Sequence, residues 1–117
     1  MRRKEALAEL IAKVEAEELP DRPLVHAAFP EFHKHKSGWP IGRLIDWIMD
    51  PEDIRGMGAA KALHEAVLPG WGWALTDIGE AHILSADGPI AAGESDNPAR
   101  AWLLSILRAL QAMEADT

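Results

Sequence analysis

Two histidines, His33 and His35, lie two positions apart in the stretch "PEFHKHKSGWP" at residues 30–40. If a nearby carboxylate such as Glu31 joined them, their imidazoles could share a metal ion. The chain has no cysteine, however, and the pair lacks the H-E-x-x-H spacing of a helical zinc site. Solvated loop side chains are the simpler interpretation. The sequence therefore predicts no bound metal and no cofactor, with a metal-dependent enzyme as a disfavoured alternative.

Other motifs that carry catalysis are missing from the sequence. The segment "GMGAAK" at 56–61 has glycines and a lysine, but it lacks the spacing and the following Ser or Thr of a phosphate-binding loop. The acidic residues between 46 and 53 do not follow the pattern of a calcium loop. There is no G-x-S-x-G and no Ser/His/Asp ordering. We therefore expect no catalytic residues and a protein that is not an enzyme.

The loop around the two histidines carries most of the local positive charge and one tryptophan. Lys34, Lys36 and Arg43 flank Trp39, and these four residues are the candidate partner-binding site. An aromatic ring supplies buried area, and neighbouring cations orient an acidic partner. Two alternatives stay open. The basic loop 33–43 is a nucleic-acid contact, or it is a mobile loop that only keeps the protein in solution.

Composition favours a protein or small-molecule partner over a nucleic acid. The 117 residues are 48% hydrophobic and 26% charged, which is typical of a single globular domain. A formal net charge of −7 repels phosphate backbones, so nucleic-acid binding would need a local basic patch. The stretch "MRRKEALAEL" leads into a charged amphipathic pattern, and no apolar run has the length of a membrane span. These features predict a soluble intracellular protein without a membrane partner.

The first half of the chain reads as helical, over residues 4–49. In "KEALAELIAKVEAEE" the apolar residues recur at helical spacing and charged residues line the other face. Asp21 and Pro23 suit the first turn of a short second helix, which Pro30 ends. The segment 31–40 lacks periodicity and is expected to be an exposed loop. Helical spacing returns from Ile41 to Ile48.

The second half predicts a helix–hairpin–helix core over residues 58–114. A helix in "AAKALHEAVL" ends at Pro69 and Gly70. The runs "GWGWALT", "AHILS" and "PIAAGES" read as strands separated by turns, and they form a small antiparallel meander. Asn97 is the expected N-cap of the last helix, with Pro98 at its first position. Helices around a meander predict an α+β fold, in one domain spanning 1–117.

This second half resembles the phage ABA sandwich domain family. The resemblance rests on a helix that ends in an apolar-Pro-Gly-Trp turn, a Trp-x-Trp strand, a hairpin and a Pro-started helix, which match Gly70, Trp71, Trp73, Gly93 and Pro98. Asn97 stands where the family usually has threonine, and "PDR" at 20–22 fits the N-terminal half. The matching region is 60–113. The insert 32–58 is not accounted for by the family pattern.

The resemblance implies an α-β-α layered sandwich and a small protein encoded by a tailed phage or prophage. It supplies no catalytic residues. It therefore implies an accessory protein of unknown role that binds another protein, of the phage or of its host, in the bacterial cytoplasm. If helices cover the sheet, Trp71 and Trp73 should fill one interlayer space, while Gly72 lets a helix approach the other face. An exposed stacking platform for bases or sugars is the alternative.

Overall fold

The computed structural model describes residues 2–29, 41–50, 52–76, 79–85 and 88–115. The elements follow the predicted order of helices, strands and a final helix. They are α1 (Arg3–Glu15), α2 (Arg22–Ala28), α3 (Ile41–Met49), α4 (Gly56–Val67), β1 (Gly72–Leu75), β2 (Glu80–Ser85), β3 (Gly88–Glu94) and α5 (Pro98–Ala115). The α+β class with a small antiparallel meander is confirmed. The predicted loop 31–40 lies outside the described residues.

Local sequence signals set the helix boundaries. Asp21 caps α2, since its carboxylate accepts a hydrogen bond of 2.9 Å from the backbone N–H of Leu24. Asn97 caps α5 in the same way, with 3.0 Å between its side-chain oxygen and the backbone nitrogen of Ala99. Both caps were predicted from the sequence. Each satisfies a backbone N–H that the first turn of a helix leaves without an intrahelical partner.

The three strands form one antiparallel sheet in the order β1-β2-β3. Trp73 pairs with Ile83 and Ile83 pairs with Ala91, so these three side chains share one face of the sheet. A bulge interrupts the pairing of β2 with β3 beyond Ile83. Both β1 and β3 are edge strands, each with one side that pairs with no other strand of this sheet.

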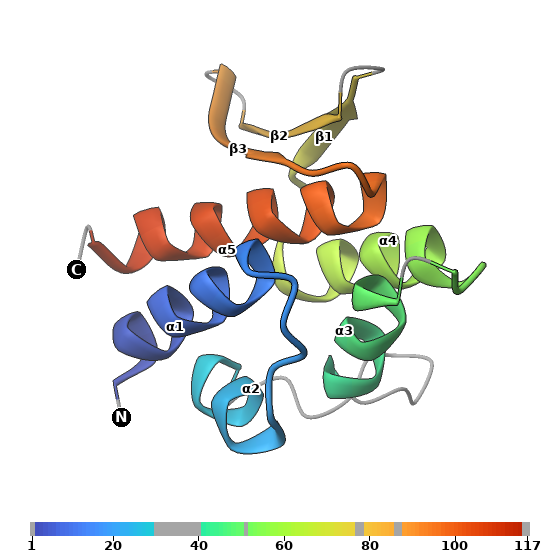
Figure 1. Ribbon diagram of the computed structural model, residues 1–117. Coiled ribbons are helices and arrows are strands. Elements are labelled where there is room, and N and C mark those ends of the chain that lie inside the picture. The colour runs from blue at the N-terminus through green and yellow to red at the C-terminus, as the bar shows by residue number, and fades with distance from the viewer. Residues whose placement is uncertain (1, 30–40, 51, 77–78, 86–87, 116–117) are drawn as a thin grey trace.

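The sheet lies across α5, and α5 packs on the other side against α1, α3 and α4 (Figure 1). The helix α2 lies farther from the sheet, against α1 and α3. This arrangement is a layered sandwich with the sheet as an outer layer. The core lies on the helical side of the sheet, where α5 contributes a continuous series of buried residues from Ala99 to Leu107.

One glycine permits the contact between sheet and helix. A Cβ added at Gly93 of β3 would lie 2.4 Å from the carbonyl oxygen of Ala101 and 2.8 Å from the backbone nitrogen of Ser105. The backbone of β3 therefore rests directly on the backbone of α5. The prediction placed this close approach at Gly72, which is wrong, because Gly72 is exposed and an added Cβ there would meet only Leu84.

The two indoles of the Trp-x-Trp strand have different environments. Trp71 is partly buried against the core, but Trp73 is 41% exposed although its ring centroid lies only 4.3 Å from that of Trp102. The prediction that Trp73 fills a closed interlayer space is wrong. Trp73 stays partly exposed because α5 packs mainly under β3 and β2. The inner face of β1 therefore overhangs the helix, and one face of the Trp73 ring meets solvent.

Candidate functional site

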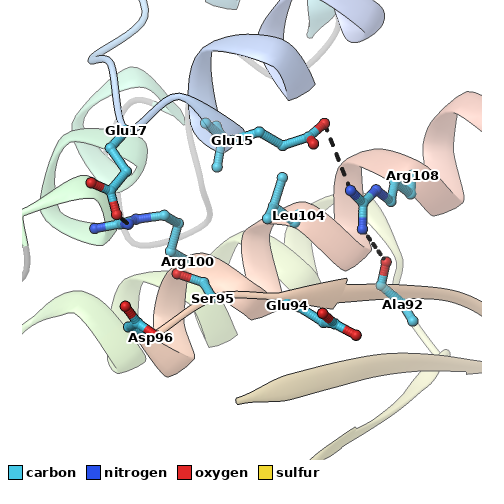
Figure 2. Close-up of a pocket in the computed structure, with 10 residues that line it drawn as sticks. Glu15, Glu17, Ala92, Glu94, Ser95, Asp96, Arg100, Leu104 and Arg108 are labelled. Carbon is cyan, nitrogen blue, oxygen red and sulfur yellow. Dashed lines mark hydrogen bonds and ion pairs between the residues drawn. The ribbon is translucent and has the colours of Figure 1, made fainter.

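A groove of about 430 Å³ lies between the end of α1, the outer edge of β3 and one face of α5 (Figure 2). We call it the α1–β3–α5 groove. It is lined by Val14, Glu15, Glu17, Ala92, Glu94, Ser95, Asp96, Arg100, Leu104 and Arg108. Of these residues only three are aliphatic, so the groove is mainly a charged surface with an apolar centre.

The floor of the groove is one stripe of α5. Arg100, Leu104 and Arg108 follow each other at intervals of four residues, which places them on the same face of the helix. Leu104 is buried and separates the two guanidinium groups. Helical geometry sets Arg100 and Arg108 about 12 Å apart along the axis. The floor therefore offers two cationic positions with an apolar step between them.

Arg100 is buried yet incompletely hydrogen-bonded. Its side chain is 8% exposed, and its Nη1 donates a hydrogen bond of 2.5 Å to a carboxylate oxygen of Glu17. Its Nε is buried and has no hydrogen-bond partner among the residues that the structure describes. A buried donor without an acceptor costs about 1–3 kcal/mol.

Glu17 approaches Arg100 from a strained position. It follows the last turn of α1 with a φ of 61°, and it is the single non-glycine residue with positive φ in the described part of the chain. Its N–H donates to the carbonyl of Val14, and the N–H of Glu18 donates to the carbonyl of Lys13, which is a Schellman ending. Glycine usually occupies this position. A glutamate in this left-handed conformation destabilises the folded state by roughly 1 kcal/mol. From there its carboxylate reaches Arg100.

Arg108 connects α5 to the edge of β3. Its Nη1 donates a hydrogen bond of 2.8 Å to the carbonyl oxygen of Ala92, and its Nη2 lies 3.7 Å from a carboxylate oxygen of Glu15 (Figure 2). The carbonyl of Ala92 points away from β2, at the open side of the strand. Arg108 therefore occupies a backbone acceptor that would otherwise be free at this edge.

The rim of the groove is acidic. Glu15 and Glu17 on the α1 side pair with the two arginines, whereas Glu94 and Asp96 on the β3 side make no ion pair within the part of the chain that the structure describes. Four carboxylates against two guanidiniums give the groove a formal charge of −2. The carboxylates of Glu94 and Asp96 lie at the outer rim, and that of Glu94 points away from the two arginines (Figure 2). They therefore favour a cationic ligand group at the rim on the β3 side.

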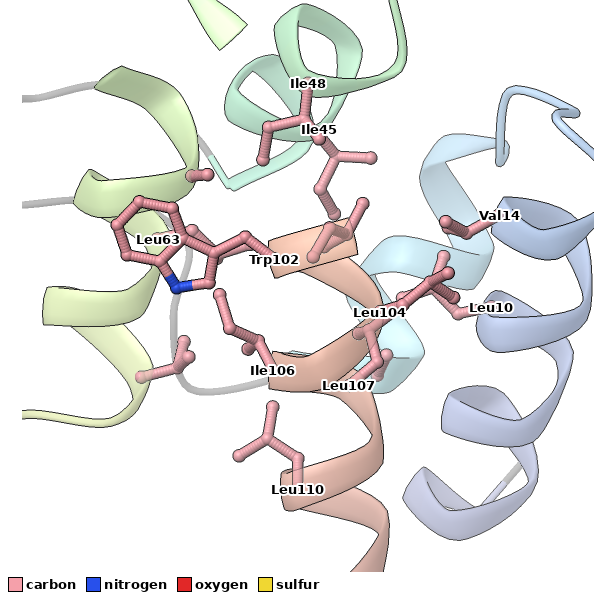
Figure 3. Close-up of a cluster of buried hydrophobic side chains, with 14 of the residues drawn as sticks. Leu10, Val14, Ile45, Ile48, Leu63, Trp102, Leu104, Ile106, Leu107 and Leu110 are labelled. Atoms are coloured by element: carbon pink, nitrogen blue, oxygen red, sulfur yellow. The ribbon is translucent and has the colours of Figure 1, made fainter. Parts of the chain in front are cut away.

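A second polar cluster is structural. The indole N–H of Trp102 donates to His64 Nδ1 at 3.2 Å, and His64 Nε2 lies 2.8 Å from the carbonyl oxygen of Trp71. An indole N–H only donates, so Nδ1 accepts and Nε2 carries the proton that reaches Trp71. Trp102 is itself buried, between α5 and Leu63 of α4 (Figure 3). His64 is therefore a structural residue, with both ring nitrogens hydrogen-bonded.

The acidic run between 46 and 53 also has a structural role. Asp53 accepts hydrogen bonds from the backbone N–H and the side chain of Arg55, and the side-chain bond is the main cause that lowers the pKa of Asp53. The guanidinium of Arg55 lies 4.3 Å from the ring centroid of Trp47. These contacts join the end of α3 to the start of α4. Within the described ranges, no three His, Cys, Asp or Glu side chains are grouped to hold a metal ion.

Most of the predicted partner-binding residues cannot be placed. Lys34, Lys36 and Trp39 lie outside the described residues, as do His33 and His35. Arg43 is described, on the exposed side of α3. The groove was missed by sequence reasoning. The sequence signal for the groove was the pair Arg100 and Arg108 inside an otherwise apolar helical segment. Two cations on a buried helix face need hydrogen-bond acceptors from other elements.

Comparisons with known proteins do not assign the chain. No family model matches it, and neither a curated protein nor a solved structure matches it. For the helices that the structure describes, none has the length and apolar character needed to cross a bilayer.

Proposed function

We propose that this protein is a binding protein and not an enzyme, and that its α1–β3–α5 groove holds a basic segment of another protein. The observation that carries the proposal is a buried, incompletely bonded Arg100 in the floor of the groove together with the exposed carboxylates Glu94 and Asp96 at its outer rim. The groove offers a guanidinium donor in its floor and carboxylate acceptors at its rim.

A peptide segment supplies both complementary groups. Its backbone carbonyls accept hydrogen bonds from the guanidinium of Arg100, and its Lys or Arg side chains pair with Glu94 and Asp96. The apolar step at Leu104 suits a small or aliphatic side chain between these contacts. The net charge of −7 attracts a basic partner over a longer range and raises its association rate.

The biological setting in this proposal comes from the resemblance of residues 60–113. The Pro-Gly-Trp turn, the Trp-x-Trp strand and the capped last helix support a phage or prophage accessory protein that acts in the cytoplasm of a bacterial host. Its partner is then a protein of the phage or of the host. The four residues Lys34, Lys36, Trp39 and Arg43 stay a predicted second contact, directed at an acidic region.

The test begins with peptides selected from a random display library against the immobilised full-length protein. We expect the selected peptides to be rich in Lys and Arg. A Glu94→Gln, Asp96→Asn double variant should bind them at least ~10-fold more weakly, because it removes the two unpaired carboxylates. The matched control is Glu5→Gln, Glu9→Gln, which changes the net charge equally on the exposed face of α1.

The control variant should bind the peptides nearly as well as the natural sequence does. Equal weakening by both double variants would mean that only net charge matters, and the groove assignment would be wrong. Selection of acidic peptides that lose binding on Lys34→Ala, Lys36→Ala, Trp39→Ala substitution would move the interface to the loop 33–43. Salt-sensitive retention on heparin would instead favour the nucleic-acid alternative.

A further inference from the structure

The two edges of the sheet are not equivalent. In an antiparallel pair, residues alternate between those that bond to the neighbouring strand and those whose N–H and C=O point away from it. The N–H of Thr76 donates to the carbonyl of Glu80, which fixes this alternation along β1. Trp71, Trp73 and Leu75 therefore direct their backbone groups to the open side of β1. The same alternation directs Ala92 outward on β3, in agreement with its bond to Arg108.

The edge of β3 carries several features that prevent further pairing. Pro89 lacks an N–H, a bulge distorts the strand beyond Ala91, Glu94 adds an exposed charge, and Arg108 occupies the carbonyl of Ala92. Natural sheets use prolines, bulges and charges in this way to protect their edges. No further strand is expected at β3.

The edge of β1 carries none of these features. Its sequence, GWAL, has no charge and no proline, and its pairing with β2 is regular. His64 occupies the carbonyl of Trp71, but within the described ranges no hydrogen bond reaches the outward groups of Trp73 and Leu75. Two N–H and two C=O groups beside the half-exposed ring of Trp73 therefore have no partner among the described residues.

We propose that this edge pairs with a second copy of the chain. A twofold axis that passes midway between the Ala74 residues of the two copies sets Trp73 of each copy opposite Leu75 of the other. Each of these pairs forms two N–H···O=C bonds, so four bonds use every open backbone group of both strands. The two sheets join into one continuous antiparallel sheet, and β3 remains the outer strand at each end.

Charge and side-chain size favour a second copy over another occupant. The residues that meet are uncharged, so the net charge of −7 on each chain is not concentrated at the contact. The two Ala74 residues lie opposite each other across the axis, at a position that forms no hydrogen bond between the two copies and where paired Cα atoms approach to about 4.5 Å. Two methyl groups fit there without a clash. On the helical face, Trp73 covers Leu75 of the second copy, an aromatic–aliphatic pair that stabilises sheets.

The pairing has a consequence for binding. The α1–β3–α5 groove lies at the edge opposite to β1, so a dimer presents two grooves at its two ends. A partner with two basic segments could engage both of them and gain avidity. The dimer itself does not depend on the groove, and its test uses the isolated chain.

Sedimentation equilibrium of the full-length protein, from about 1 µM to about 1 mM, tests the proposal. The wide range is needed because pairing between two four-residue strands makes a small contact and therefore a weak dimer. We expect a monomer–dimer equilibrium. Leu75→Pro removes one outward N–H and should weaken the dimer at least ~10-fold relative to Leu75→Ala, which loses the same side chain but keeps the N–H.

A cysteine placed on the axis gives a second, independent measurement. The natural chain has no cysteine, so Ala74→Cys introduces a single thiol whose counterpart in the dimer lies within disulfide reach. The matched control is Ala92→Cys, in the same row and on the same face of the sheet but at the β3 edge. On mild oxidation Ala74→Cys should form covalent dimers at least ~10-fold faster than Ala92→Cys.

Sedimentation as a monomer at every concentration would overturn the proposal, whatever the variants do. A dimer whose covalent linkage forms equally fast from both cysteine variants would place the contact elsewhere. A third result would also contradict the proposal. If the protein is a monomer and binds displayed peptides only when residue 75 keeps its N–H, the β1 edge pairs with a different protein.

Discussion

At the scale of single residues, His64 shows how one buried polar side chain can fix a local arrangement. It accepts from Trp102 and donates to the carbonyl of Trp71, so it links α4, α5 and the start of β1. Both of its ring nitrogens are used in one neutral form. The Pro-Gly-Trp turn at the end of α4 is therefore held by a side chain of that same helix.

Replacing His64 tests this link. His64→Leu keeps an apolar volume but leaves the N–H of Trp102 and the carbonyl of Trp71 without their partner, so we expect a loss of about 1–3 kcal/mol in the free energy of unfolding. Trp102→Phe removes the donor and should also destabilise. The double variant should lose less than the sum of the two single losses, by at least ~0.5 kcal/mol in urea denaturation. Strict additivity would show that the 3.2 Å contact contributes nothing.

At the scale of elements, the contact between β3 and α5 depends on a missing side chain. The backbones approach so closely at Gly93 that a Cβ would overlap the main chain of α5, which cannot turn aside as a flexible side chain could. This contact fixes the separation of sheet and helix. It also sets the depth of the groove, because Ala92 and Glu94 flank Gly93 and Leu104 lies beneath it.

Gly93→Ala should therefore lower the free energy of unfolding by about 1–3 kcal/mol or more, because the added methyl group forces strand and helix apart. Gly58→Ala is the matched control. Gly58 lies in α4, is exposed and has no atom within 4 Å of an added Cβ. Its replacement should stabilise the protein by about 0.5–1 kcal/mol through helix propensity. Chemical denaturation of both variants measures the contrast, and similar midpoints would refute the close approach.

The start of α5 gives a prediction of its own. Asn97→Ala removes the acceptor for the N–H of Ala99 and should cost about 0.5–2 kcal/mol. Asp96→Ala should cost less, since Asp96 is exposed and acts on the helix only through its charge. The denaturation midpoints of both variants give the comparison. A larger loss for Asp96→Ala would mean that the helix begins one residue earlier.

The sequence predicted the elements and their caps because those are local properties. Apolar spacing located α1 and α5, and Asn97 and Asp21 occupy the positions that their side-chain chemistry suits. It did not predict which glycine approaches a helix, since Gly72 and Gly93 look alike until the sheet has been placed on α5. The groove was missed for the same reason. Glu17 and Arg100 are 83 positions apart, and their contact exists only once α1 and α5 have packed together.

At the scale of the whole molecule, α5 is the element that every layer requires. It packs against β2 and β3 on one side and against α1, α3 and α4 on the other, and its residues from Trp102 to Leu107 are all buried (Figure 3). Opening of this helix would expose the contacts of every layer at once. Local opening there is therefore as costly as complete unfolding. The outward N–H groups of Trp73 and Leu75 in β1 represent the other extreme, because no hydrogen bond from the described residues reaches them.

Hydrogen exchange monitored by NMR measures both extremes when a dilute and a concentrated sample of the protein are compared. The amides of Leu104 and Leu107 should exchange with a free energy equal to that of global unfolding, at any protein concentration. The amides of Trp73 and Leu75 should exchange rapidly in dilute protein and at least ~10-fold more slowly where the dimer predominates. The amide of Ala74 bonds to β2 and serves as the internal control, with slow exchange in both samples. Slow exchange of Trp73 in the dilute monomer would show that its own chain covers the β1 edge.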